Sequence, residues 1–254
     1  MLDASISPIV RTFSVFVDAL TKERKTKEAE GVLEVIIQRD VDPNVVTYST
    51  LMDGCCLQGH MDEAIKVFNT MVDRGLHPDV VSYNILINGC CKKMKIDEAM
   101  HLFQEMPRRG LKPNIETFST ILQALFQVGR CGAAHKLFNK MQTVGIIPDS
   151  QTYGILLDGL CKNGHISEAL SSFHSGCLPD GVTYNIIIRG FIGQYKCFEA
   201  LILVEEMVQS GFSVDASTFP LVVDILSTKG QDPALQEVIK KFMPKNSHEM
   251  QENE

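Results

Sequence analysis

Cysteine and histidine offer the widest chemistry among the residue types of this 254-residue chain. Eight cysteines occur, including the adjacent pairs Cys55–Cys56 and Cys90–Cys91, but none form the C-x-x-C spacing typical of zinc and redox sites. The seven histidines show no metal-ligand spacing either. Sequence motifs of acyl-transfer, deaminase and phosphate-binding sites do not occur. We therefore predict no enzymatic activity, no metal and no cofactor.

The two cysteine pairs lie 35 residues apart, and this spacing recurs along the chain. An aromatic column advances in steps of 35, 35, 35, 35, 31 and 35 through Phe13, Tyr48, Tyr83, Phe118, Tyr153, Tyr184 and Phe219. An alanine column and a proline column share the single 31-residue step. They consist of Ala29, Ala64, Ala99, Ala134, Ala169 and Ala200, and of Pro8, Pro43, Pro78, Pro113, Pro148 and Pro179. Three columns in one register indicate an array of repeats.

The columns define the predicted domain organisation. The repeat array spans 10–244, divided into 10–44, 45–79, 80–114, 115–149, 150–180, 181–215 and 216–244. We expect residues 1–9 to be the end of a truncated preceding repeat and residues 245–254 to be a polar tail.

Each repeat has the pattern of two helices. In 45–79 the first helix carries an apolar stripe with helical spacing, formed by Tyr48, Leu51, Met52 and Cys55. The second carries Met61, Ala64, Ile65, Phe68 and Met71 or Val72. Gly59 separates the two helices. Such short pairs bury their apolar faces only by stacking on each other, which predicts an all-α solenoid with first helices on its inner face.

The cysteines fit this packing. Cys56, Cys91 and Cys161 share one position near the end of the first helix, and Cys131 and Cys197 share another at the start of the second. Small apolar residues recur where the packing recurs, so we interpret these cysteines as core residues.

The segments VVTYSTLMDGCCLQGHMDEAIKVFNTMVDRGLHPD (45–79) and VVSYNILINGCCKKMKIDEAMHLFQEMPRRGLKPN (80–114) resemble the pentatricopeptide repeat. The resemblance covers about 10–243, and the even 35-residue period suggests the P subclass. The residue pattern of the repeats is similar to that of restorer-of-fertility-like members from plants. Periodicity and resemblance together predict a right-handed α-solenoid (superhelix) of about seven 35-residue helix-turn-helix repeats.

The resemblance implies binding of single-stranded RNA, one base per repeat, with the fifth and last residues of each repeat selecting the base. These pairs are Ser14/Asn44, Ser49/Asp79, Asn84/Asn114, Ser119/Asp149, Gly154/Asp180 and Asn185/Asp215. By family analogy the array should read 5′-A-G-Y-G-N-U-3′. Gly154 has no side chain to offer, and Pro220 at the fifth position of the last repeat has no clear partner.

A structural role competes with each assignment. Asp and Asn are preferred N-cap residues, so the last-residue column could serve capping alone, or both roles together. The fifth-position Ser and Asn are less easily explained, because such residues are mediocre inside helices.

The resemblance also implies flanking and phosphate-contacting positions. The second residue of a repeat would flank the base, and it is Val46, Val81 and Val182 in three repeats. Glu116 and Gln151 depart from this pattern. Lys22, Lys92 and Lys162 share one position at the end of the first helix and are candidates for phosphate contact or ordinary solvated lysines.

The net charge of −7 argues against non-specific nucleic-acid binding. However, acidic pairs such as Asp62–Glu63 and Asp97–Glu98 lie on predicted second helices, so the inner face is expected to be less acidic.

We therefore predict sequence-selective RNA binding, with single-stranded RNA and protein partners of an organellar RNA-processing complex. No apolar run is long enough to span a membrane, and no small-molecule substrate is expected. The resemblance suggests mitochondria, with the chloroplast as the other organelle, although residues 1–13 do not resemble a transit peptide. The alternatives are a protein-interaction scaffold that binds a peptide, and a truncated copy without independent function.

Overall fold

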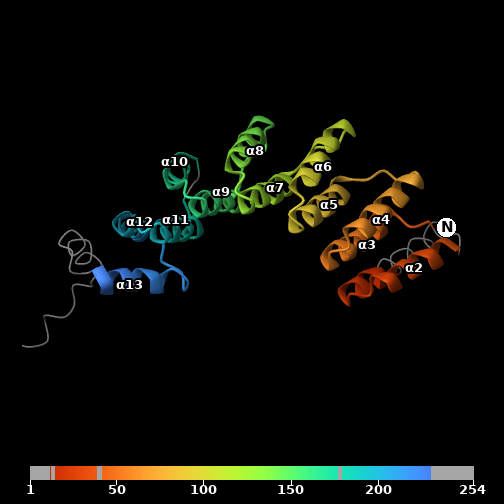
Figure 1. Ribbon diagram of the computed structural model, residues 1–254, viewed down its shortest axis with the longest axis horizontal. Coiled ribbons are helices and arrows are strands. Elements are labelled where there is room, and N and C mark those ends of the chain that lie inside the picture. The colour runs from red at the N-terminus through yellow and green to blue at the C-terminus, as the bar shows by residue number, and fades with distance from the viewer. Residues whose placement is uncertain (1–11, 13–14, 39–41, 177–178, 230–254) are drawn as a thin grey trace, which may run out of the picture. The chain divides into compact units, whose positions relative to one another are not determined.

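The computed structural model describes residues 12, 15–38, 42–176 and 179–229, and these residues form helices and no strand (Figure 1). They divide into two compact units, Met1–Ile146 and Ile147–Glu254. After a helical segment at 15–22, the helices of the first unit are α2 (Thr26–Gln38), α3 (Val45–Gln58), α4 (Met61–Asp73), α5 (Val80–Lys92), α6 (Ile96–Arg108), α7 (Ile115–Gln127) and α8 (Cys131–Thr143). Those of the second are α9 (Ser150–Lys162), α10 (Ile166–Gly176), α11 (Gly181–Gly193), α12 (Cys197–Gln209) and α13 (Phe219–Lys229).

Packing within each unit follows the helix pairs of the repeats. In the first unit α3 packs against its partner α4 and also against α5, and α5 packs against α6 and α7. In the second unit α9 packs against α10 and α11, and α11 against α12. First helices of successive repeats are therefore direct neighbours within a unit.

Helix boundaries coincide with the repeat boundaries read from the sequence. The helices α3, α5, α7, α9 and α11 begin at the first residue of the repeats that start at 45, 80, 115, 150 and 181. The last repeat differs, because α13 begins three residues later than residue 216.

The recurring aromatic and alanine residues form the core. Tyr48 and Tyr83 are fully buried, and so is Ala64. The aromatic ring of a first helix packs edge-on against a phenylalanine of the preceding second helix. The centroid distances are 5.5 Å for Phe68–Tyr83, 5.1 Å for Phe103–Phe118 and 4.9 Å for Phe173–Tyr184. This arrangement favours the ring quadrupoles and explains why the period carries an aromatic residue.

One predicted core position is wrong. Ile65 is 37% exposed, whereas Val67, which the predicted stripe omits, is buried at 8% exposure. The buried residues of α4 are therefore Met61, Ala64, Val67, Phe68 and Met71. The predicted burial of Cys56, Cys91 and Cys161 is confirmed, whereas Cys131 and Cys197 are only half-buried.

The turn between the two helices of a repeat requires a left-handed residue. Gly59 occupies it with a φ of 79° and caps α3. At the same repeat position Met94 and Tyr195 adopt φ values of 59° and 58°. Left-handed backbone costs a residue with a Cβ about 1–2 kcal/mol, so these two turns are held by the helices on either side.

No helix in the described part of the chain combines the length and apolar character needed to cross a bilayer.

Candidate nucleic-acid interface

The last residue of a repeat caps the first helix of the next. The side chains of Asn44, Asp79, Asn114, Asp149 and Asp180 each accept a hydrogen bond from the backbone N–H of the third helical residue. These N···O distances lie between 2.7 and 3.0 Å. Asp215 accepts from the Thr218 amide at 2.7 Å in the same way. The capping interpretation of this column is therefore correct for these residues.

A hydroxyl column that the sequence analysis missed supports the caps. The third residue of the repeat is Ser or Thr, and it is almost fully buried at Thr47, Ser82, Thr117, Thr152, Thr183 and Thr218. Its hydroxyl binds the capping side chain, as in the 2.9 Å bond from Ser82 to Asp79. The signal was present in the sequence, because a hydroxyl residue follows each Asp or Asn at the spacing of a cap partner.

The same hydroxyls connect the caps to the fifth residue of the preceding repeat. Ser82 Oγ lies 3.1 Å from Ser49 Oγ. Thr117 Oγ1 donates to Asn84 Oδ1 at 2.7 Å. Each such contact brings the two predicted base-selecting residues of one repeat to a common point.

Two pairs of fifth and last residues are in direct contact. Asn84 Nδ2 donates to Asn114 Oδ1 at 3.2 Å, and the Asp215 amide donates to Asn185 Oδ1 at 3.0 Å. The fifth residues Ser49, Asn84 and Asn185 are nevertheless only 4–8% exposed. A ligand can therefore reach the edge of these side chains but cannot surround them.

The other predicted pairs are less complete. Gly154 is buried, and a Cβ added to it would lie 3.2 Å from Ile186 Cδ1, so this repeat offers only Asp180. Ser119 is half-buried in the first unit, and its predicted partner Asp149 belongs to the second. Ser14 lies outside the described residues.

Apolar side chains at the second position of the repeat are exposed. Val46, Val81 and Val182 are 62%, 57% and 64% exposed, although each lies within the first turn of a well-packed helix. An exposed valine recurring beside a pair of polar side chains offers an apolar contact for a flat ring. Glu116 and Gln151 occupy the equivalent positions and are also exposed.

Two charged side chains reach into the fifth and last pairs. Glu116 Oε2 accepts a hydrogen bond from Asn84 Nδ2 at 3.1 Å. Arg189 Nη1 donates to Asp215 Oδ2 at 3.0 Å and also reaches Thr218. Neither the amide–carboxylate contact nor the arginine is predicted by the sequence pattern.

Capping lowers the pKa values of the carboxylates in this surface. Hydrogen bonds from the Thr152 amide and hydroxyl lower the pKa of Asp149. Burial by itself would raise the pKa of Asp180, but hydrogen bonds from Thr183 and Ser150 outweigh it and lower the pKa. Burial likewise opposes the hydrogen bonds that hold the pKa of Asp215 far below its usual range. These aspartates are ionised at neutral pH and act only as acceptors.

The three lysines proposed for phosphate contact differ in their surroundings. Lys22 and Lys162 are 73% exposed, and each pairs with the aspartate four residues earlier, Asp18 at 2.6 Å and Asp158 at 2.8 Å. Lys92 has Asn88 at that position and forms no ion pair among the described residues. Lys92 thus differs from Lys22 and Lys162 in having no ion pair on its own helix, although its charge acts on the Asp53 carboxylate.

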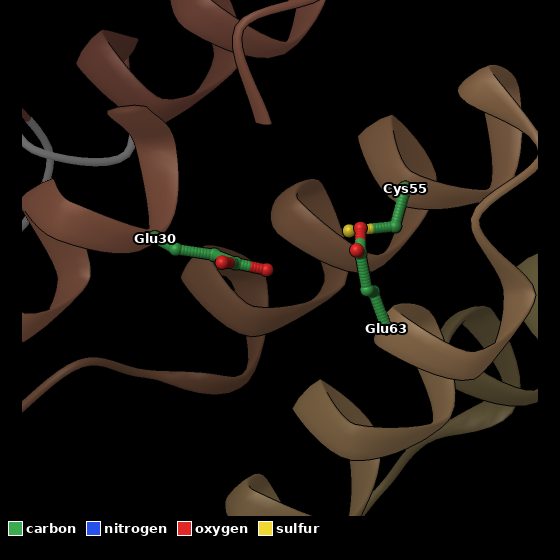
Figure 2. A group of neighbouring side chains, drawn as sticks. All are labelled: Glu30, Cys55 and Glu63. Carbon is green, nitrogen blue, oxygen red and sulfur yellow. The ribbon is translucent and has the colours of Figure 1, made fainter. Parts of the chain in front are cut away.

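A cluster with metal-ligand chemistry lies apart from these pairs. Glu30 of α2, Cys55 of α3 and Glu63 of α4 bring their ligand atoms within 4.8 Å of one another (Figure 2). Burial and the two carboxylates raise the pKa of the Cys55 thiol to about 12. Because a thiol must lose its proton to bind a metal, this environment opposes ligation at neutral pH.

Models of the PPR repeat match most of the chain. The model described as PPR repeat family matches residues 56–92, 78–127 and 113–162. One model described as PPR repeat matches residues 39–72. A second model with the same description matches residues 11–41, 151–175 and 182–212. The chain belongs to the pentatricopeptide repeat (PPR) family. No curated protein matches it significantly.

Solved PPR structures share the fold. The crystal structure of PPR10 from maize superposes with a TM-score of 0.72 at 24% identity, covering 91% of this PPR chain and 34% of that protein. PPR10 in complex with an 18-nt psaJ RNA element gives a TM-score of 0.63 at 24% identity, over 91% of this chain and 33% of that one. Nuclear proteinaceous RNase P 2 from A. thaliana gives a TM-score of 0.57 at 18% identity, covering 72% of this chain and 42% of that one. The PPR chain spans about a third of the length of PPR10, and these matches confirm the predicted all-α repeat solenoid.

Proposed function

We propose that this PPR chain binds single-stranded RNA in a sequence-selective manner, one base per repeat. The observation that carries the proposal is the contact between the fifth and last residues, Asn84 with Asn114 and Asn185 with Asp215, beside the exposed second-position valines. A base lying against a valine would present its polar edge to such a pair. The similarity to PPR10, which has been crystallised with an RNA element, supports this proposal.

The proposal predicts the preferred sequence of the RNA. The residues in the pairs suit 5′-A-G-Y-G-N-U-3′, with the N-terminal repeat at the 5′ end. Binding should be strongly salt-dependent, because the phosphates contribute most of the affinity of such complexes. Each stacked base adds about 1–3 kcal/mol.

A binding competition tests the proposal. The labelled oligonucleotide 5′-AGCGAU-3′ is titrated with the protein at moderate salt, against unlabelled oligonucleotides of the same composition in scrambled order. We expect the matched sequence to compete several-fold better. Equal competition would contradict base selection by the pairs, and a protein partner retained after ribonuclease treatment would favour the scaffold alternative.

We also propose a biological setting, an organellar RNA whose processing, stability or translation depends on this binding, with mitochondria as the first expectation and the chloroplast as the second. Family resemblance supports it. Crosslinking the tagged protein in cells and sequencing the bound RNA should recover organelle-encoded transcripts. Recovery of nuclear transcripts alone would contradict this setting. Incubation with the bound RNA should leave that RNA uncleaved, because we propose binding without catalysis.

A further inference from the structure

Glu116 is built into the base-facing pair of the repeat that precedes it. Its Oε2 accepts from Asn84 Nδ2 at 3.1 Å, while the same Nδ2 donates to Asn114 Oδ1 at 3.2 Å. Asn84 Oδ1 accepts from the Thr117 hydroxyl at 2.7 Å. The side-chain amide of Asn84 therefore has a protein partner for both of its N–H groups and for its oxygen.

The neighbouring cap is equally occupied. Asn114 Oδ1 accepts from the Thr117 amide at 3.0 Å and from Asn84 at 3.2 Å, and it lies 2.8 Å from the Thr117 hydroxyl, whose single proton it shares with the closer Asn84 Oδ1. In contrast, the Glu116 carboxylate is exposed and uses one oxygen for Asn84. A carboxylate has about four lone-pair sites, so Glu116 keeps most of its accepting capacity for a ligand. The group that this pair presents to a base is thus an acceptor with a negative charge.

The other repeats lack this feature. Val81 and Val182 stand where Glu116 stands, and Gln151 is neutral. In the second Asn-type pair the equivalent residue is Ser217, and the nearby charge is positive, because Arg189 contacts Asp215 at 3.0 Å. Two pairs that share Asn at the fifth position therefore differ in the sign of the charge beside them.

We infer that Glu116 makes the repeat 80–114 select cytosine over uracil. This inference rests on the proposed RNA binding and decides which pyrimidine the third repeat of the array prefers. The exocyclic amino group of cytosine can donate a hydrogen bond to a carboxylate. Uracil carries a carbonyl oxygen at the same ring position, which can only accept. Asn84 cannot compensate for uracil without breaking its bond to Glu116 or Asn114. Glu116 is a specificity-determining residue that acts through direct contact with the base.

The test compares 5′-AGCGAU-3′ with 5′-AGUGAU-3′. Wild-type protein should bind the cytosine oligonucleotide about tenfold more tightly, within the range expected for one good base contact. Glu116→Val, which restores the residue type of the other repeats, should bring the two affinities within about twofold, mainly by improving the binding of the uracil oligonucleotide. Glu116→Gln keeps an acceptor without the charge and should retain part of the preference.

A matched control lies one repeat further on. Gln151→Val makes the same change of size at the same repeat position and should leave the ratio of cytosine to uracil at the third base unchanged. Circular dichroism and thermal melting should show all three variants folded, because Glu116 and Gln151 are exposed.

Three results would overturn the inference. Wild-type protein that binds both oligonucleotides equally, but better than a scrambled one, would refute this inference and leave the proposed function intact. A Glu116→Val protein that keeps the wild-type preference for cytosine would show that Glu116 does not select the base. If its affinity for both oligonucleotides also rises by the same factor, the carboxylate only repels RNA. Failure to bind either oligonucleotide better than the scrambled one would refute the proposed function together with the inference.

Discussion

Asp79 offers a way to separate the capping of a helix from the selection of a base. Its Oδ1 accepts from the Ser82 amide at 2.8 Å and from the Ser82 hydroxyl at 2.9 Å, at the start of α5. Asn44 and Asn114 cap α3 and α7 with the same geometry. Asp79→Asn should therefore preserve the cap, whereas Asp79→Ala should remove it.

The cost of removing the cap follows from its surroundings. Loss of an N-cap side chain costs about 0.5–2 kcal/mol, and a buried donor left without a partner costs about 1–3 kcal/mol. Ser82 is completely buried, so its amide and hydroxyl cannot turn to water. We expect Asp79→Ala to lower the free energy of unfolding by about 2 kcal/mol, in the upper part of the capping range. The midpoint of thermal unfolding should then fall by several degrees.

Two measurements on the same two variants test this reasoning. Chemical denaturation should place Asp79→Asn within about 0.5 kcal/mol of wild type, as expected when one capping residue replaces another. Binding assays should show its preference at the second base moving from guanine toward adenine. If Asp79→Asn destabilises the protein as much as Asp79→Ala does, the cap depends on charge and not on geometry. If its base preference is unchanged, the last residue serves capping alone.

Other perturbations address packing, pH and phosphate contact. Gly89→Ala places a Cβ 2.5 Å from a sulfur atom of the preceding repeat and should cost about 1–3 kcal/mol in denaturation experiments, whereas Gly132→Ala meets open space and should be neutral or slightly stabilising. The pKa of Asp149 is lowered in the folded state, so its stabilising effect is complete above the unfolded value of about 3.9 and is lost as the pH falls through the folded pKa. Between pH 6 and pH 2 the free energy of unfolding should fall less for Asp149→Asn than for wild type. Identical pH dependence of the two proteins would contradict this assignment. Lys92→Gln should reduce the slope of log affinity against log salt by about 0.7, the value for one phosphate contact on a single strand, while Lys162→Gln, whose charge is already paired, should change it less. Equal effects of the two substitutions would show that the ion pair opens on binding.

The repeat register could be predicted from the sequence because its columns have separate physical causes. An aromatic residue, an alanine and a capping residue each recur for a different reason, and all share one period. The hydroxyl of Thr117 could have been found by the same reasoning. The predicted burial of Ile65 is wrong, because the residue pattern of one helix does not show which of its side chains the neighbouring helices cover.

The charged contacts could not be predicted in this way. Glu116 and Arg189 are long side chains whose direction depends on the neighbouring repeat, so their contacts with Asn84 and Asp215 follow only from the assembled helices. Periodicity shows that a residue is unusual for its column but not what it touches.

The caps at Asn44, Asp79 and Asn114 also bear on how such an array can change its target over generations. Asn and Asp cap these helices with the same hydrogen bond, and the codons for Asn and Asp differ by one nucleotide. A single point mutation in the gene can therefore alter the chemical group that the array would offer to the proposed RNA ligand, while the helix still begins at the same residue. If the chain binds RNA as proposed, an array of this kind can follow a drifting RNA sequence one repeat at a time and keep its helix caps.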